Sequence, residues 1–219
     1  MNIAFLFYEG MTALDAIGPH EVLSRLPGAK VFRVAEKKGP IQTDSADLIL
    51  MADYALEDVP KADVVLVPGA GSATPLIDHP NTLKWLRAIH ATTTWTTSVC
   101  TGSLILGAAG LLSHVKATTH WAAMDRLKHW HAIATHERVV QDGKIMTSAG
   151  VSAGIDMALL LSSKIAGDKF AQAIQLGLEY DPHPPFNVGS PEKADPAIRE
   201  GLRSRMTAHF VRVPHGLSS

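Results

Sequence analysis

The sequence contains a single cysteine in 219 residues, Cys100. One cysteine excludes an internal disulfide and makes the chain compatible with the reducing conditions of the cytoplasm. The formal net charge is only −1, so no excess charge favours binding to nucleic acid or to an anionic membrane. No apolar run reaches the roughly 18 residues that a membrane-spanning helix needs. We therefore expect a soluble cytoplasmic protein with no nucleic-acid or membrane partner.

Targeting signals and repeats are missing as well. The opening segment MNIAFLFYEGM lacks the basic start and the small-residue cleavage site of a signal peptide, and it resembles a first strand. With 46% hydrophobic and 19% charged residues, the composition is that of an ordinary globular protein. We expect residues 1–219 to form one domain, with an irregular C-terminal arm from about residue 181, where Pro, Gly and Asp become frequent.

Short apolar runs alternate with helical patterns along most of the chain. This alternation predicts an α/β fold with a mostly parallel central sheet and helices on both faces. Gly18-Pro19 predicts a kink or a restart in the first helix. Strands are expected at 2–8, at 29–35, within 47–56 near an edge, within 62–72, at 93–99, at the start of 116–121, and as a hairpin within 136–150. Helices are expected at 12–26, 79–91, 101–110, 151–167, 168–179 and 195–210.

Cys100 lies where the expected strand 93–99 meets a helix. In a doubly wound sheet, ligands bind at the carboxyl ends of the strands. The small residues that follow Cys100 permit a tight turn that projects its side chain. A helix amino terminus favours thiolate over thiol, so we expect a lowered pKa and a nucleophilic sulfur. The alternative is a buried, inert cysteine, which behaves as a small hydrophobic residue.

A glycine loop, VPGAGS (67–72), ends another expected strand. Gly69 and Gly71 let the backbone turn tightly and approach a ligand. The free N–H groups of Gly69, Ala70 and Gly71, with that of Thr101, are candidates for binding charge that develops on a substrate. A phosphate-binding loop is excluded because no Gly-Lys-Ser/Thr follows. A plain connection between a strand and a helix is the alternative.

Asp15 lies among apolar neighbours after the first strand. A partly desolvated carboxyl there would have a raised pKa, suited to sharing a proton with a thiol. The alternative is ordinary charge compensation at a helix amino terminus. Among the histidines, His120 follows the strand-like residues ATT and is the candidate neighbour of the site, although a structural role is equally open. The histidines in HWHAIATH (129–136) match no zinc signature, so no metal site is expected.

Five segments in order resemble the ThiJ/PfpI superfamily, namely MTALDAIGPHEVL, VVLVPGAGS, SVCTGSLILGAAGLL, ATTHW and TSAGVSAGIDMALLL. The resemblance spans about residues 1–180 and implies a flavodoxin-like sandwich on a class I glutamine-amidotransferase-type core. The tail LGLEYDPHPPFNVGSPEKADP is similar to the isonitrile hydratase branch, which extends the match to nearly the whole chain. Members of the superfamily are usually homodimers, and the resemblance implies a homodimer here.

Departures from other branches narrow the expected activity. PfpI-type proteases carry a histidine directly after the cysteine, whereas this sequence has Thr101, which argues against peptidase activity. The related regulators carry a helix-turn-helix domain after the shared part, and the chain stops at Ser219, so DNA binding is not expected. In the branch of the parkinsonism-associated protein the acid near the cysteine is a glutamate. Asp15 stands there in this sequence, which fits the hydratase branch.

The resemblance implies a lyase that adds water to an isonitrile and releases an N-substituted formamide. Cys100 would attack the terminal carbon to form a thioimidate, and Asp15 would hold and deliver the thiol proton and then help to activate water. Thr101 would position Asp15 or the water. No cofactor is implied. Two alternatives stay open: a glyoxalase for methylglyoxal-like carbonyls, and a non-enzymatic sensor whose Cys100 is oxidised to a sulfinate.

Overall fold

Seven strands form the central sheet of the computed structural model, which describes residues 1–45, 47–71 and 76–209. Their order is β10-β11-β7-β6-β1-β2-β5, and neighbouring strands are parallel except for the hairpin of β10 and β11. The strands are β1 (Asn2–Leu6), β2 (Lys30–Ala35), β5 (Tyr54–Ala55), β6 (Val64–Val67), β7 (Trp95–Val99), β10 (Val139–Asp142) and β11 (Ile145–Ser148). The predicted α/β fold with a mostly parallel sheet is confirmed.

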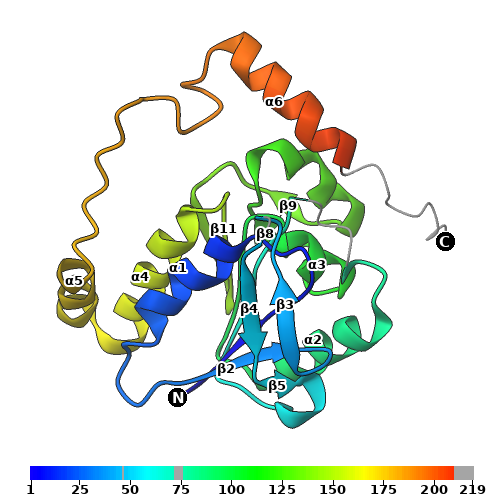
Figure 1. The fold of residues 1–219 in the computed structure, drawn as a ribbon, viewed down its shortest axis with the longest axis vertical. Helices are drawn as coiled ribbons and strands as arrows, with labels where there is room; N and C mark the ends of the chain where they lie inside the picture. The colour runs from blue at the N-terminus through cyan, green and yellow to red at the C-terminus, as the bar shows by residue number, and fades with distance from the viewer. Residues whose placement is uncertain (46, 72–75, 210–219) are drawn as a thin grey trace.

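Helices flank the sheet on both sides (Figure 1). On one side α1 (Ala13–Leu23) packs on α4 (Ala153–Ala166), and α4 packs on α5 (Asp168–Gly177). The other side carries α2 (Pro80–Thr92), α3 (Gly102–Ala108) and the 3-10 segment η3 (Trp121–Trp130). A further 3-10 turn, η1 (Leu56–Asp58), directly follows β5. The neighbouring strands β1 and β6 are mostly apolar and buried on both faces, as is typical of parallel strands between two helix layers.

Four shorter strands form two small sheets outside the central one. β3 (Gly39–Gln42) pairs with β4 (Ile49–Ala52) in an antiparallel hairpin, and β8 (Lys116–Ala117) pairs with β9 (Ile133–Ala134). The single edge strand expected within 47–56 is therefore divided. Its first part joins β3, and only β5 reaches the edge of the central sheet. The short strand β3 was not expected from the sequence, because its four residues GPIQ show no strand pattern of their own.

Helix α1 is continuous through Gly18 and Pro19, so the helix does not restart there. The side chain of Pro19 packs closely on Gly154 of α4, and a β-carbon at Gly154 would lie 3.0 Å from the proline ring. Packing against a neighbouring helix stabilises this turn although Pro19 has no N–H to donate within it.

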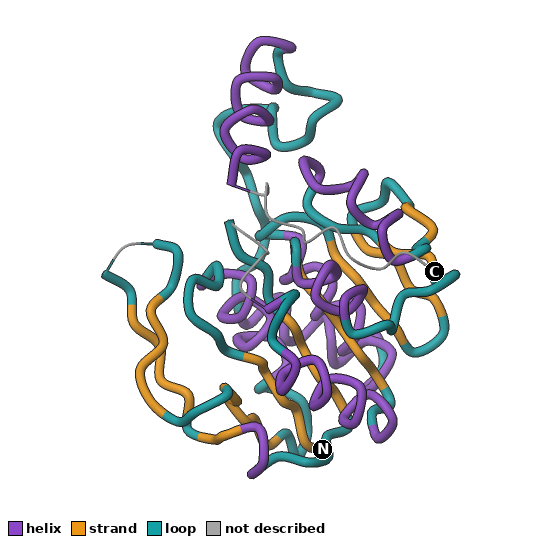
Figure 2. The backbone as a smooth tube through the Cα atoms, turned by 90° about the vertical axis from the view of Figure 1, so that its right-hand side faces the viewer, coloured by secondary structure: helices purple, strands orange, loops and turns teal. Residues whose placement is uncertain are grey.

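The chain after α5 runs without helix or strand to α6 (Pro196–His209). Helix α6 lies beyond the ends of the strands rather than on a face of the sheet (Figures 1 and 2). It contacts η3, where the guanidinium of Arg203 lies 5.9 Å from the centre of the Trp121 ring. Within the described ranges no helix is long and apolar enough to cross a bilayer. Ser72 of the glycine loop and residue 210 of the last expected helix lie outside those ranges.

Candidate active site

Cys100 forms the turn between β7 and α3. Its φ angle is 57°, a left-handed conformation that residues other than glycine rarely adopt. The Cys100 N–H donates to the backbone oxygens of Ser148 and Ala149, at 3.1 Å each, and the Thr119 hydroxyl donates to the Cys100 carbonyl at 3.0 Å. A backbone conformation held in this way is typical of a nucleophile at a strand end. The thiol thus lies at the carboxyl end of a central strand.

Asp15 lies in the first turn of α1 and is completely buried. Its Oδ2 accepts a hydrogen bond of 2.9 Å from the Gly69 N–H, and the Cys100 thiol donates to the same carboxylate. Burial raises the pKa of Asp15 from its ordinary 3.8 to about 7, the negative charge of Asp44 adds to that shift, and the two hydrogen bonds oppose it. Asp15 is therefore a desolvated partner of the thiol, and it is not the exposed acid that would compensate charge at a helix amino terminus.

The expected lowering of the Cys100 pKa is wrong. Cys100 is only 5% exposed, and burial, followed by the charge of Asp15, raises the pKa of its thiol. The backbone N–H groups of Thr101 and Val151 and the Thr101 side chain lie close to the sulfur and offset only part of that rise. Helix α3 has seven residues, so its dipole is small against the cost of desolvation. As the pH rises through about 7, the pair of Cys100 and Asp15 therefore passes from two protons to one.

The loop from Gly69 to Gly71 orients the side chains around this pair. A β-carbon on Gly69 would lie 2.6 Å from the Thr101 nitrogen and 2.9 Å from Asp15 Oδ2, so only glycine fits there. The Ala70 N–H donates to the Thr101 hydroxyl at 2.9 Å, and that hydroxyl donates back to the Ala70 carbonyl. The Gly71 N–H donates to Asp44 at 3.3 Å. All three loop N–H groups therefore have side-chain acceptors in this structure, and their role in binding substrate stays a prediction.

Val151 is a site residue that the sequence analysis missed. It follows β11, its N–H faces the Cys100 sulfur, and its φ of 35° is unusual for a β-branched residue. The sequence carried a signal for it. Residues 136–150 were predicted as two strands, and the end of a strand that runs parallel to β7 must lie beside the end of β7.

His120 lies against the segment that leads to Val151. A β-carbon on Gly150 would be 2.5 Å from His120 Cδ2, so the imidazole packs directly on the glycine backbone. His120 Nδ1 accepts a hydrogen bond of 3.2 Å from the Ala122 N–H. The ring is 9% exposed, and burial lowers its pKa to about 4, so it is uncharged at neutral pH. Within the described ranges no three His, Cys, Asp or Glu side chains are grouped to hold a metal ion.

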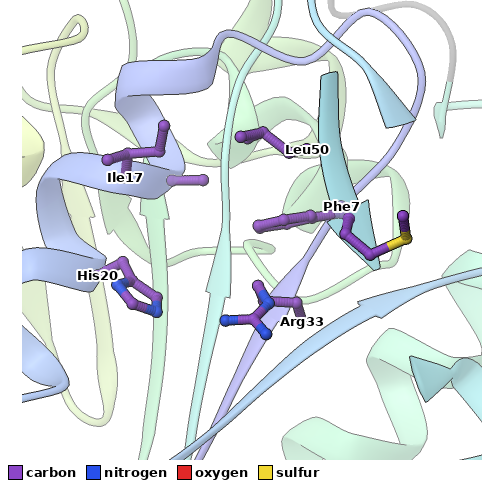
Figure 3. Close-up of a pocket in the computed structure, with 7 residues that line it drawn as sticks. Phe7, Ile17, His20, Arg33 and Leu50 are labelled. Atoms are coloured by element: carbon purple, nitrogen blue, oxygen red, sulfur yellow. The ribbon is translucent and has the colours of Figure 1, made fainter. Parts of the chain in front are cut away.

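A cavity of about 280 Å³ lies beside α1 but apart from this pair (Figure 3). Its walls are apolar except for His20 and Arg33, and they include Phe7, Ile17 and Leu50. Neither Cys100 nor Asp15 lines it. The thiol and the carboxyl therefore lie outside this cavity.

Comparison with known proteins gives consistent similarities. The model of the DJ-1/PfpI family matches residues 1–164. The chain is 44% identical over 205 residues to the isonitrile hydratase of Pseudomonas putida. The aligned region covers 94% of this chain and 90% of that protein. It is 30% identical to the HTH-type transcriptional regulator CdhR of Pseudomonas aeruginosa, over 76% of this chain and 51% of the regulator. The crystal structure of a ThiJ/PfpI family protein from Pseudomonas syringae superposes with a TM-score of 0.92 at 38% identity, covering 95% of this chain and 86% of that one.

Proposed function

The chain belongs to the DJ-1/PfpI family, and we propose that within this family it is an isonitrile hydratase that converts an isonitrile and water into an N-substituted formamide. The 44% identity to the Pseudomonas putida enzyme over most of both chains supports the activity. The buried contact between the Cys100 thiol and the Asp15 carboxylate carries the chemical argument, because it supplies a nucleophile and a proton carrier at one point.

The first step forms a covalent thioimidate. The Asp15 carboxylate takes the thiol proton while the Cys100 sulfur bonds to the terminal carbon of the isonitrile. Protonated Asp15 then returns the proton to that carbon, which gives R–N=CH–S–Cys with no atom left over. The N–H groups of Thr101 and Val151 face the sulfur, so they stabilise the thiolate as it forms.

The second step hydrolyses this intermediate. Asp15, again a carboxylate, accepts a proton from a water molecule that attacks the imidate carbon, and the nitrogen takes up that proton. The resulting R–NH–CH(OH)–S–Cys collapses to the formamide and regenerates the thiol. The Thr101 hydroxyl is held by Ala70 rather than by Asp15, so its proposed role is to fix the loop that donates to Asp15. The uncharged His120 contributes an apolar wall beside the Val151 segment.

A substrate assay tests this function. Purified protein, without added metal, should convert alkyl and aryl isonitriles to formamides, which mass spectrometry detects. Cys100→Ala and Asp15→Asn should each lose turnover by at least about 100-fold, in line with the loss of a nucleophile or a general acid. Asp63→Asn, an exposed acid just before β6 at the opposite end of the sheet, is the matched control and should keep full activity. Full activity in Cys100→Ala contradicts the mechanism, and efficient D-lactate formation from methylglyoxal contradicts the proposed substrate.

The proposal extends to assembly and location. A homodimer is proposed because Ile49 and Met51, two residues apart on strand β4, are exposed apolar side chains, and Met51 also lines the cavity beside α1. Light scattering after gel filtration measures the molecular mass of the protein in solution. A mass equal to that of one chain would contradict the proposed homodimer. A cytoplasmic location is proposed because the chemistry needs a reduced cysteine, which the cytoplasm maintains; cell fractionation tests it.

A further inference from the structure

Asp44 lies outside the central sheet, in the loop between β3 and β4, and it contacts two segments of the site. Its Oδ2 accepts a short hydrogen bond from the Thr12 hydroxyl and a second bond of 3.3 Å from the Gly71 N–H. Its own N–H donates to the Met11 carbonyl at 3.0 Å. One exposed acid therefore joins the start of α1 to the glycine loop.

The two joined segments are those that hold Asp15. Thr12 directly precedes α1, which carries Asp15 in its first turn, and its N–H donates to the Gly69 carbonyl at 2.8 Å. Gly69 in turn donates its N–H to Asp15 Oδ2. A bridge between Met11 and Ala70 adds a third tie. The carboxylate of Asp44 thus closes a ring of contacts around Asp15.

The hydroxyl of Thr12 gives a second indication. Thr12 occupies the amino-terminal capping position of α1, where a threonine hydroxyl ordinarily accepts a bond from a helix N–H. Here it makes no such bond and donates to Asp44 instead. Helix α1 therefore lacks the side-chain hydrogen bond that would cap it, and the Thr12 hydroxyl instead connects the start of α1 to Asp44.

We propose that Asp44 is a positioning residue of this site, whose carboxylate holds the first turn of α1 and the Gly69–Gly71 loop around Asp15. The inference rests on the proposed hydration, in which Asp15 carries a proton from the cysteine to the substrate. The negative charge of Asp44 also favours the protonated form of Asp15. The other titratable groups that face Asp15 are Cys100 and Tyr8, whose phenol donates to the Pro68 carbonyl at 2.9 Å.

The test separates the charge of Asp44 from its contacts. Asp44→Asn keeps the size and an acceptor oxygen but removes the charge, so the pKa of Asp15 should fall. The rising acid limb of kcat/KM against pH should then move to lower pH by roughly half a unit. Asp44→Ala also removes the contacts and should lower kcat by about 10-fold with little change in KM, because Asp44 does not touch the substrate. Circular dichroism checks that both variants are folded, and if Asp44→Ala unfolds, Asp44→Asn decides alone.

Asp47→Asn is the matched control. Asp47 is exposed in the same loop, and its φ of 70° suits asparagine. The substitution Asp47→Asn removes an equal charge, and the pH profile of kcat/KM of this variant should stay that of the wild type. An unshifted limb in Asp44→Asn, an equal shift in Asp47→Asn, or an unchanged kcat in a folded Asp44→Ala overturns the inference.

A second readout does not depend on the isonitrile. The rate of Cys100 alkylation by iodoacetamide should rise with pH through the same limb, because the sulfur can ionise only after the pair has lost its first proton. Asp44→Asn should shift this limb as well, and an unshifted alkylation profile contradicts the inference. If wild-type protein makes no formamide, the proposed function fails while the alkylation profiles still decide the role of Asp44.

Discussion

Replacing Asp15 with asparagine should abolish activity and yet stabilise the folded protein above neutral pH. The pKa of Asp15 is about 7 in the folded chain, against an ordinary value of 3.8. Between these two pH values the folded state keeps a proton that the unfolded chain has lost. Stability from this group is therefore fully present below about pH 4 and is lost as the pH rises through 7.

The magnitude follows from the shift. One pKa unit corresponds to about 1.4 kcal/mol, so a shift of about 3 units makes the ionised Asp15 cost about 4 kcal/mol at pH 8. At pH 5 the same calculation gives about 2 kcal/mol, because the folded carboxyl is still protonated there. Asparagine carries no charge and avoids this cost. The stability of Asp15→Asn relative to wild type should therefore increase by about 2 to 3 kcal/mol between pH 5 and pH 8.

Denaturant unfolding of both proteins at pH 5 and pH 8 measures this change. The amide of asparagine brings a cost of its own, since Asp15 Oδ1 has no hydrogen-bond partner in the described structure and an NH₂ group there would lack an acceptor. That cost is the same at both pH values and cancels in the comparison. Asp63→Asn should show no such pH dependence. A difference between Asp15→Asn and wild type that does not change with pH would refute the raised pKa, and with it the shared proton.

Other expected outcomes concern the same pair and its backbone. In wild type, kcat/KM should rise with pH through about 7 and then level off, because the pair must lose one proton before Asp15 can act as a base; a flat profile from pH 5 to pH 9 contradicts this. Gly69→Ala should lose activity and at least about 2 kcal/mol of stability in a thermal melt, because its β-carbon would overlap the Thr101 backbone. Val151→Gly should raise stability by about 1 kcal/mol, because glycine accepts the φ of 35° without strain, whereas Val151→Ala should not.

The position of Cys100 at the end of a strand could be predicted because it depends on chain order and apolar pattern. Parallel strands place their carboxyl ends at one edge of the sheet. Cys100 follows β7 and the glycine loop follows β6, which lies beside β7, so the two are neighbours. Asp15 follows from the same rule, since β1 lies beside β6. Local sequence was sufficient to place each of these residues at a strand end, and the strand order of the structure makes them neighbours.

The sign of the Cys100 pKa shift could not be predicted in this way. The sequence shows a helix amino terminus, which lowers the pKa of a thiol, but it does not show how completely the surrounding chain removes water. Nor does it show Asp44, which reaches the site from a hairpin whose first strand has no strand pattern. Both features depend on how distant segments pack, and a single sequence carries no local trace of that packing.

Burial of the thiol and the carboxyl together accounts for the number of protons that the pair holds and for the free energy that the ionised Asp15 costs the folded protein. In a poorly solvated site a second negative charge is strongly disfavoured, so the pair keeps one proton from about pH 7 to far above it. The proposed hydration needs a proton to leave the sulfur, reach the substrate and be replaced from water, and a pair that holds one proton could meet that need. Exposure to solvent would lower both pKa values, so burial does not bring the proton affinities of the thiol and the carboxylate closer together. The proton must therefore leave the sulfur as the bond between the sulfur and the substrate carbon forms, since no favourable transfer from the thiol to Asp15 precedes that bond.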